Sequence, residues 1–291
     1  MGPIFAPGII EGLLATLAIS MVPICVSAVK TDIITIGMVR LAIAIFGLGV
    51  WTFFYKKRSH SFTPKQWIAL TLIGLFFGTH WLTFFASIKI SSAAIGAIGI
   101  STFGLHLTIL NWIFTEQRPR LNSLIAITMA ITGSYMIIPD FSIENTNTLG
   151  LILGIFSAFV YALVPILHQK NKDIPTSSRT LAQFTIALIF FAFFSPMAQW
   201  NIPNSDWPIL IFMGVFCTLI GHGLWVRATT LLPAKTTSCI FYMGLPFTLL
   251  FEFLITSNPM SPPTLIGAAL ILTANLLNQK DKNHSKTKQR A

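Results

Sequence analysis

The amino-acid sequence predicts an all-α membrane protein of ten transmembrane helices, built as two inverted five-helix repeats. Three observations lead to this prediction: ten apolar segments of bilayer-crossing length, an alternating distribution of basic residues between them, and a weak internal repeat. The 291 residues are 54% hydrophobic and only 10% charged, whereas a soluble domain carries about 25% charged residues. This composition excludes an ordinary soluble protein.

Each apolar segment is expected to form a helix because its hydrophobic run is long and continuous. A membrane strand would instead alternate apolar and polar residues, and about 20 apolar residues are needed for a helix to cross the hydrocarbon core. Prolines such as Pro64, Pro175 and Pro203 mark the breaks between segments. The expected spans are residues 8–29, 35–55, 66–88, 93–115, 121–138, 149–169, 179–200, 207–229, 236–256 and 262–278.

Basic residues gather in every second loop. Of the 19 Lys and Arg residues, sixteen fall in one set of alternate loops and the C-terminal tail, two (Lys30 and Lys89) fall in the other set, and Arg40 lies within a span. Cytoplasmic loops carry such an excess, so we expect a bacterial-type inner (plasma) membrane protein with both termini in the cytoplasm. Topology and contact with anionic lipid explain the formal net charge of +10, so no nucleic-acid partner is expected.

The two halves of the chain resemble each other weakly. Residues 80–105 and 222–245 both begin with a histidine, His80 and His222, followed by an aromatic-rich stretch and a helix of small residues, at an offset of 142. Five helices per half is an odd number, so the second half must enter the membrane in the opposite sense, an arrangement common in secondary transporters. The predicted units are residues 1–140 and 141–279, followed by a basic cytoplasmic tail at 280–291.

Several stretches carry a family resemblance. They are Lys30 and Arg40 in the first hairpin, SIKISSAAIGAIG (87–99), TEQRPRLNSLIAITMAITGSYMI (115–137), ATTLLPAKTTS (228–238) and LITSNPMSPPTLIGAALILTANLL (254–277). With them the chain resembles the drug/metabolite transporter superfamily, EamA type, and two such units cover nearly its whole length. The resemblance implies a secondary transporter without a cofactor, moving a small polar or amphipathic metabolite, with an amino-acid-like compound as the best candidate.

The sequence departs from the family pattern at three places. The usual Gly-Glu pair that ends the fourth helix of a unit is Thr115-Glu116 in the first unit and Ser257-Asn258 in the second. The proline common midway along that helix is Pro246 in the second unit and Gly104 in the first. The motifs therefore identify the fold and leave the substrate open.

Ionisable side chains inside the spans are the first candidates for a transport site, because a charge at the bilayer centre costs about 2.5–3.5 kcal/mol on insertion scales and faces a cavity or a partner. His80 and His222 are equivalent in the repeat, and each lies close to a tryptophan, Trp81 or Trp225. An imidazole binds a carboxylate, carries a proton, or simply bonds a neighbouring helix. No metal is expected, since no ligand spacing supports one.

Five further side chains are substrate-binding or gating candidates. Arg40 and Glu252 are expected at similar depth, where they form an ion pair or gate the substrate, and the planar fork of Arg40 suits a carboxylate. His106 follows a row of small residues, which indicates either tight helix packing or a place in the lumen. Tyr161 and Tyr242 lie in mid-helix, the latter just before a proline that bends its span, and could stack on a substrate.

Other classes of function are disfavoured or stay open. The chain has no Walker loop, no HExxH and no GxSxG, so neither an enzyme nor an ATP-driven pump is expected. Alternating access would be driven by the substrate gradient, by exchange, or by proton coupling through His80, His222 or a carboxylate. Two rivals remain: a flippase-like carrier of lipid head groups, which predicts lateral openings, and a non-transporting membrane scaffold, which predicts a solid bundle. Oligomeric state and the direction of transport are left open.

Overall fold

The computed structural model of the chain describes residues 8–54, 62–115, 121–137, 142–232, 234–257 and 260–280. Within these ranges all regular structure is helical and no residue lies in a strand. The expectation of an all-α protein is therefore confirmed for the described part of the chain.

The helices coincide with the ten apolar segments. The first half holds α1 (Ile9–Ile19), α2 (Val22–Ala28), α3 (Ile33–Phe54), α4 (Pro64–Ile90), α5 (Ala93–Ser101), α6 (Phe103–Thr115) and α7 (Leu121–Ile137). The second half holds α8 (Thr146–Lys170), α9 (Thr176–Ala192), the 3-10 turn η1 (Ser195–Met197), α10 (Trp207–Phe212), the π-helix η2 (Met213–His222), α11 (Gly223–Leu231), α12 (Ala234–Tyr242), α13 (Gly244–Thr256) and α14 (Pro262–Lys280).

Among the described residues, six helical stretches are long and apolar enough to cross a membrane, namely Ile9–Ala28, Ile33–Phe54, Pro64–Ile90, Thr146–Lys170, Trp207–Leu231 and Thr236–Thr256. Shorter apolar helices cover Ala93–Leu107 and Pro262–Ala274. The helices α7 and α9 have 17 residues each, slightly fewer than the roughly 20 that a bilayer needs. Six crossings thus follow from length and composition, and the full count of ten stays a prediction.

Three of the apolar segments are interrupted near their middle. The break between α1 and α2 falls at Ser20 and precedes Pro23, which occupies the first turn of α2. The break between α5 and α6 falls at Thr102, whose hydroxyl donates to the carbonyl of Gly99 over 2.8 Å, a back-bond that bends helices. The break between α12 and α13 falls at Met243, just before Pro246, which has no N–H to donate.

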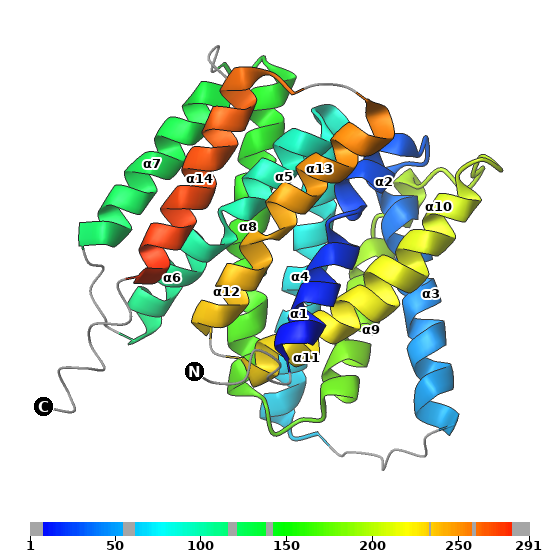
Figure 1. The fold of residues 1–291 in the computed structure, drawn as a ribbon. Coiled ribbons are helices and arrows are strands. Elements are labelled where there is room, and N and C mark those ends of the chain that lie inside the picture. The colour runs from blue at the N-terminus through cyan, green and yellow to red at the C-terminus, as the bar shows by residue number, and fades with distance from the viewer. Residues whose placement is uncertain are drawn as a thin grey trace, which may run out of the picture.

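Helix packing places the breaks together in the centre of the bundle. Figure 1 shows α7 beside α14 at one edge of the molecule and α3 at the opposite edge, with α1, α4, α5, α8 and α13 between them. Glycines allow the closest approaches: a Cβ added to Gly99 of α5 would lie 2.7 Å from the Cα of Gly154 in α8. Small residues at such crossings let membrane helices pack on each other.

A polar network joins the two halves of the chain at one end of the bundle. The Asp206 carboxylate, before α10, accepts hydrogen bonds from the backbone N–H groups of Lys30 and Thr31, at 2.7 and 2.8 Å, and from the Thr31 hydroxyl at 2.7 Å. Asp32 accepts from the Gln199 N–H at 2.9 Å. Burial raises the pKa of Asp206, but the hydrogen bonds from Thr31, Lys30 and Ser205 outweigh it and hold the pKa below its usual value.

Candidate functional site

A small internal cavity lies where the broken helices meet. Its volume is about 60 Å³, room for a few waters, since one water occupies roughly 30 Å³ of liquid. Known ligand pockets measure about 300–1,000 Å³, so the cavity in this conformation is smaller than a typical ligand pocket. Its polar wall consists of Thr16, Ser20, Arg40, His80, Ser101, Tyr161, His222 and Thr248. Its aromatic wall consists of Trp81, Phe84, Phe85, Trp225 and Phe241.

All three interrupted segments contribute to this cavity. Ser20, Ser101 and Gly244 line it, and each lies at or next to one of the breaks. The Thr248 hydroxyl of α13 donates to the carbonyl of Ser20 over 2.8 Å, so two of the broken segments are joined there. Irregular backbone at membrane depth is found where it lines a cavity or holds a ligand, and the breaks here follow that rule.

His80 is fixed by α8. The Ser157 hydroxyl donates to the His80 carbonyl over 2.8 Å, and the same oxygen lies 2.7 Å from Nδ1 of the imidazole. Because the serine has one proton and gives it to the carbonyl, Nδ1 must carry the proton of the other bond. In the neutral imidazole Nε2 is then an acceptor. The ring stacks on Tyr161 with 4.3 Å between centroids.

His222 ends the π-helix η2 and is held by aromatic rings. Its imidazole lies 5.0 Å from the Phe77 ring, edge to face, and 5.5 Å from the Trp81 ring. The Nδ1 atom is buried and has no hydrogen-bond partner among the described residues, and the same is true of the nearby cavity hydroxyl of Thr16. The two histidines therefore differ: His80 is hydrogen-bonded to a serine of α8, and Nδ1 of His222 has no partner in the described part of the chain.

Arg40 is the one cation in the cavity wall. It is fully buried and its Nε donates to the Thr218 hydroxyl over 3.1 Å. The guanidinium carbon lies 4.2 Å from the centre of the Trp81 ring and 5.2 Å from that of Phe85, within the range of a cation–π interaction. Nη1 and Nη2 are buried and have no hydrogen-bond partner among the described residues.

The structure brings six of the nine predicted site residues to the cavity wall: Arg40, His80, Trp81, Tyr161, His222 and Trp225. The other three lie elsewhere. Tyr242 is buried with its hydroxyl against Gly104, and its neighbour Phe241 lines the cavity in its place. His106 lines a separate apolar groove of about 420 Å³ with residues of α7 and α8.

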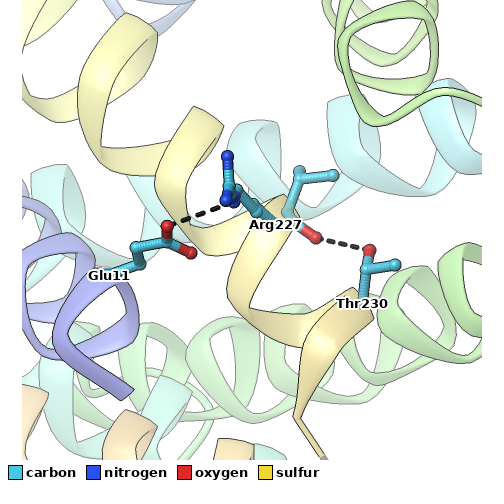
Figure 2. A network of polar contacts seen from close by, with 4 residues as sticks. Glu11, Arg227 and Thr230 are labelled. Atoms are coloured by element: carbon cyan, nitrogen blue, oxygen red, sulfur yellow. Dashed lines mark hydrogen bonds and ion pairs between the residues drawn. The ribbon is translucent and has the colours of Figure 1, made fainter. Parts of the chain in front are cut away.

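Glu252, the third, is half-buried on α13 and does not line the cavity. One of its carboxylate oxygens is buried without a hydrogen-bond partner in the described part of the chain. The only ion pair there joins Arg227 to Glu11, 3.1 Å apart, on α11 and α1 (Figure 2). The expected ion pair of Arg40 with Glu252 is thus not formed in this conformation.

Sequence reasoning missed several wall residues. Phe84 lies four positions after His80, and Phe85 lies four positions after Trp81 in the same helix, so helical periodicity could have found them. Ser157 and Thr218 do not line the cavity but hold the wall residues His80 and Arg40, and they carry no such signal because each reaches its partner from a distant helix. No group of three His, Cys, Asp or Glu side chains that could hold a metal ion exists in the ranges the structure describes.

A second buried arginine, on the opposite half, has a different environment. Arg179 of α9 donates from Nη1 to the His168 carbonyl over 2.7 Å, from Nε to the Ile174 carbonyl over 3.0 Å, and from Nη2 to the Thr230 hydroxyl over 3.1 Å. His168 in turn lies 2.7 Å from Gln183 through Nε2. This cluster is fully hydrogen-bonded and joins α8, α9 and α11, as a structural group does.

Comparison with known proteins gives a family and a fold. The model of the EamA-like transporter family matches twice, over residues 6–138 and 148–278. The biotin transporter of Escherichia coli (strain K12) is 25% identical over 179 residues, 59% of this chain and 60% of its own length. The uncharacterized transporter YwfM of Bacillus subtilis (strain 168) is 23% identical over 214 residues, 72% of either chain.

A solved crystal structure aligns over 93% of this chain and 96% of its own, with a TM-score of 0.69 and 15% sequence identity. A likeness at this identity concerns the fold alone. The match to the first of the curated relatives spans about three fifths of that relative's length. The substrate in that protein's name therefore describes the relative and is not assigned to this chain.

Proposed function

Since this chain belongs to the EamA-like transporter family, we propose that it is a secondary transporter of a small polar or amphipathic metabolite, working by alternating access. The carrying observation is the small cavity at the helix breaks, which is lined by a buried arginine and two buried histidines. The family and the names of its relatives describe transporters and not enzymes.

Corresponding helices of the two halves make corresponding contacts with the opposite half. The first-half helix α4 packs on α8 and α9, and its counterpart in the second half, η2 with α11, packs on α1 and α3. The outermost pair, α7 and α14, consists of the last helix of each half. This is the pattern of a pseudo-two-fold relation, and the family model matching twice supports two units, proposed at residues 1–140 and 141–279. With five crossings each they would be inverted in the membrane.

The membrane orientation belongs to this proposal. Sixteen basic residues on one side against two on the other favour both termini in the cytoplasm, with residues 280–291 as a basic tail there. The Asp206 network would then face the periplasmic side, and the ion pair of Glu11 with Arg227 would lie near the cytoplasm. An inner-membrane location follows for a bacterial cell.

Proton coupling would involve His80 or His222. Both imidazoles line the cavity, and histidine gains a proton within the physiological pH range when its surroundings allow. His222 is the better candidate, because its Nδ1 has no partner in the described structure whereas that of His80 is bonded to Ser157. Protonation of His222 would add a positive charge beside Arg40 unless a substrate anion balances it.

The test is uptake by proteoliposomes containing the purified full chain. Amino acids and biotin, the compound named for several relatives, are the first substrates to try. We expect uptake by the wild-type protein and its loss in His222→Ala and Arg40→Ala, while Arg227→Ala, which removes a half-exposed cation outside the cavity, retains it. Normal uptake by both cavity variants would contradict the site assignment.

A lipid-handling function is the second candidate, and the groove beside His106 favours it. This groove of about 420 Å³ is almost entirely apolar and lies among α6, α7 and α8, with Ile131 and Tyr135 exposed at its rim. An acyl chain would fit such a lateral opening. Movement of a fluorescent phospholipid between leaflets by the wild-type protein, reduced by His106→Trp, would favour this function over metabolite transport.

A further inference from the structure

We propose that the substrate is an organic anion with one carboxylate and no ammonium group, and that this carboxylate pairs with Arg40 in the cavity. The inference rests on the proposed transport function and narrows its substrate class. It begins from a cation that is completely buried yet lacks a partner for both of its terminal nitrogens.

The two buried arginines of the chain show what is missing at Arg40. Arg179 uses all three of its nitrogens in hydrogen bonds to carbonyls and hydroxyls. Arg40 uses only Nε, on the Thr218 hydroxyl. A buried charge without partners is costly, and folded proteins therefore pair it or hydrogen-bond it. The two unpaired nitrogens of Arg40 are the atoms that form a bidentate contact with a carboxylate.

No protein group balances the charge of Arg40. The described wall of the cavity contains no Asp and no Glu, and no carboxylate of the described residues lies within 4.0 Å of this guanidinium. The buried cysteines Cys25 and Cys217 supply no negative charge, because a thiol with an ordinary pKa near 8.5 is neutral at pH 7. The two histidines can only add positive charge.

The rings around Arg40 hold it in place for an incoming anion. Trp81 and Phe85 lie at 4.2 and 5.2 Å from the guanidinium carbon. A guanidinium held against ring faces keeps its N–H bonds in its own plane, free to reach a ligand at the edge. The remaining wall is mostly aromatic and aliphatic with a few hydroxyl groups, which suits an apolar or planar body attached to the carboxylate.

Charge neutrality decides between an anion and a zwitterion. A monocarboxylate brings the cavity to zero net charge, whereas an amino acid leaves one uncompensated positive charge, because its ammonium group comes with the carboxylate. An ammonium would also lie near the guanidinium and be repelled by it. The amino-acid-like candidate is thus less suitable than a simple carboxylate of similar size.

The experiment compares three probes that share one body: 3-phenylpropanoate, its zwitterionic relative L-phenylalanine, and the neutral 3-phenylpropanamide. Binding to the purified full chain in lipid nanodiscs is measured by the shift in thermal unfolding temperature over a range of probe concentrations. Wild type is compared with Arg40→Gln, with Arg40→Lys, which keeps the charge without the fork, and with the matched control Arg227→Gln.

We expect 3-phenylpropanoate to raise the unfolding temperature of wild type and of Arg227→Gln, and its apparent affinity to fall about 30-fold or more in Arg40→Gln. Arg40→Lys should bind it with intermediate affinity, which keeps the test valid if the glutamine variant folds poorly. Equal binding of the zwitterion or the amide, unchanged affinity in both Arg40 variants, or no binding of the carboxylate would each overturn the proposal.

Uptake measured in parallel separates this proposal from the function on which it rests. If proteoliposomes take up L-phenylalanine or another ammonium-bearing compound through a route that needs His222 but not Arg40, the anion proposal fails while the transporter stands. If no compound enters and no probe stabilises the protein, both fail together.

Discussion

Replacing Ser157 with alanine removes the two hydrogen bonds that fix His80 in the cavity wall. The His80 carbonyl keeps a contact from the Thr83 hydroxyl at 3.2 Å, but Nδ1 of the imidazole loses its only recorded partner. Side-chain hydrogen bonds within membrane proteins contribute about 0.6 kcal/mol on average and at most about 1.7. A buried polar group left unpaired costs about 1–3 kcal/mol.

From these two ranges we expect Ser157→Ala to lower the free energy of unfolding by about 1–2 kcal/mol. A matched control is Thr16→Val, at a cavity hydroxyl that has no hydrogen-bond partner among the described residues. This variant should be as stable as wild type or slightly more stable, because it removes an unpaired buried hydroxyl without changing side-chain shape.

The assay is reversible unfolding of the purified protein in mixed micelles, followed by circular dichroism. Nitrogen NMR of the imidazoles provides a second measurement, since His80 should carry its proton on Nδ1 in wild type and lose that preference in Ser157→Ala. If Ser157→Ala is as stable as wild type, or if Thr16→Val is destabilised equally, the reasoning from the hydrogen-bond pattern is refuted.

Three further predictions concern packing, pH and the surface. Gly99→Leu should destabilise the protein strongly, because even a Cβ at this position would lie 2.7 Å from the Gly154 backbone. Gly49→Ala should be neutral or stabilising, because no atom lies within 4 Å of the added Cβ. Thermal unfolding of both variants checks this prediction. Because the pKa of Asp206 is lowered, the stabilisation by its carboxylate is fully present above the ordinary pKa of 3.8 and is lost as the pH falls through the lowered pKa. Wild type should therefore lose more stability than Asp206→Asn when the pH is lowered from about 5 to about 2, and parallel losses in both would contradict this. Removing the half-exposed Arg227 or its partner Glu11 should change stability by less than about 1 kcal/mol, and a double-mutant cycle with a larger coupling would show that the pair is more than a surface contact.

The sequence predicts the helices well and their internal breaks poorly. Each of the ten predicted apolar segments contains helix in the described structure, because a long hydrophobic run is itself the signal of a membrane helix. The bend near Pro246 could be anticipated from a missing N–H, and α13 indeed begins at Gly244. The breaks at Ser20 and Thr102 involve residues that also occur inside regular helices, so only tertiary packing selects them. The ten-residue π-helix that ends at His222 gives no pattern in a single sequence.

The site candidates depended on how accurately a helix can be oriented from sequence. His80, Arg40 and His222 line the cavity, as expected because an ionisable group is costly in hydrocarbon unless it faces a cavity or a partner. Tyr242 and Phe241 are adjacent, and adjacent residues point about 100° apart around a helix, so a small error in the orientation of α12 was enough to select Tyr242 instead of Phe241. The partners of the ionisable groups, such as Ser157, come from other helices and could not be inferred.

The central claim is that the cavity among the broken helices opens alternately to the two sides of the membrane. A cysteine placed at Thr16, a wall residue without a hydrogen-bond partner in the described structure, in a protein with Cys25, Cys217 and Cys239 replaced, tests it most directly. If the cavity opens alternately, we expect a membrane-impermeant thiol reagent to label this cysteine from either face, and bound substrate to protect it. Labelling from one face only, or from neither, would contradict alternating access at this cavity.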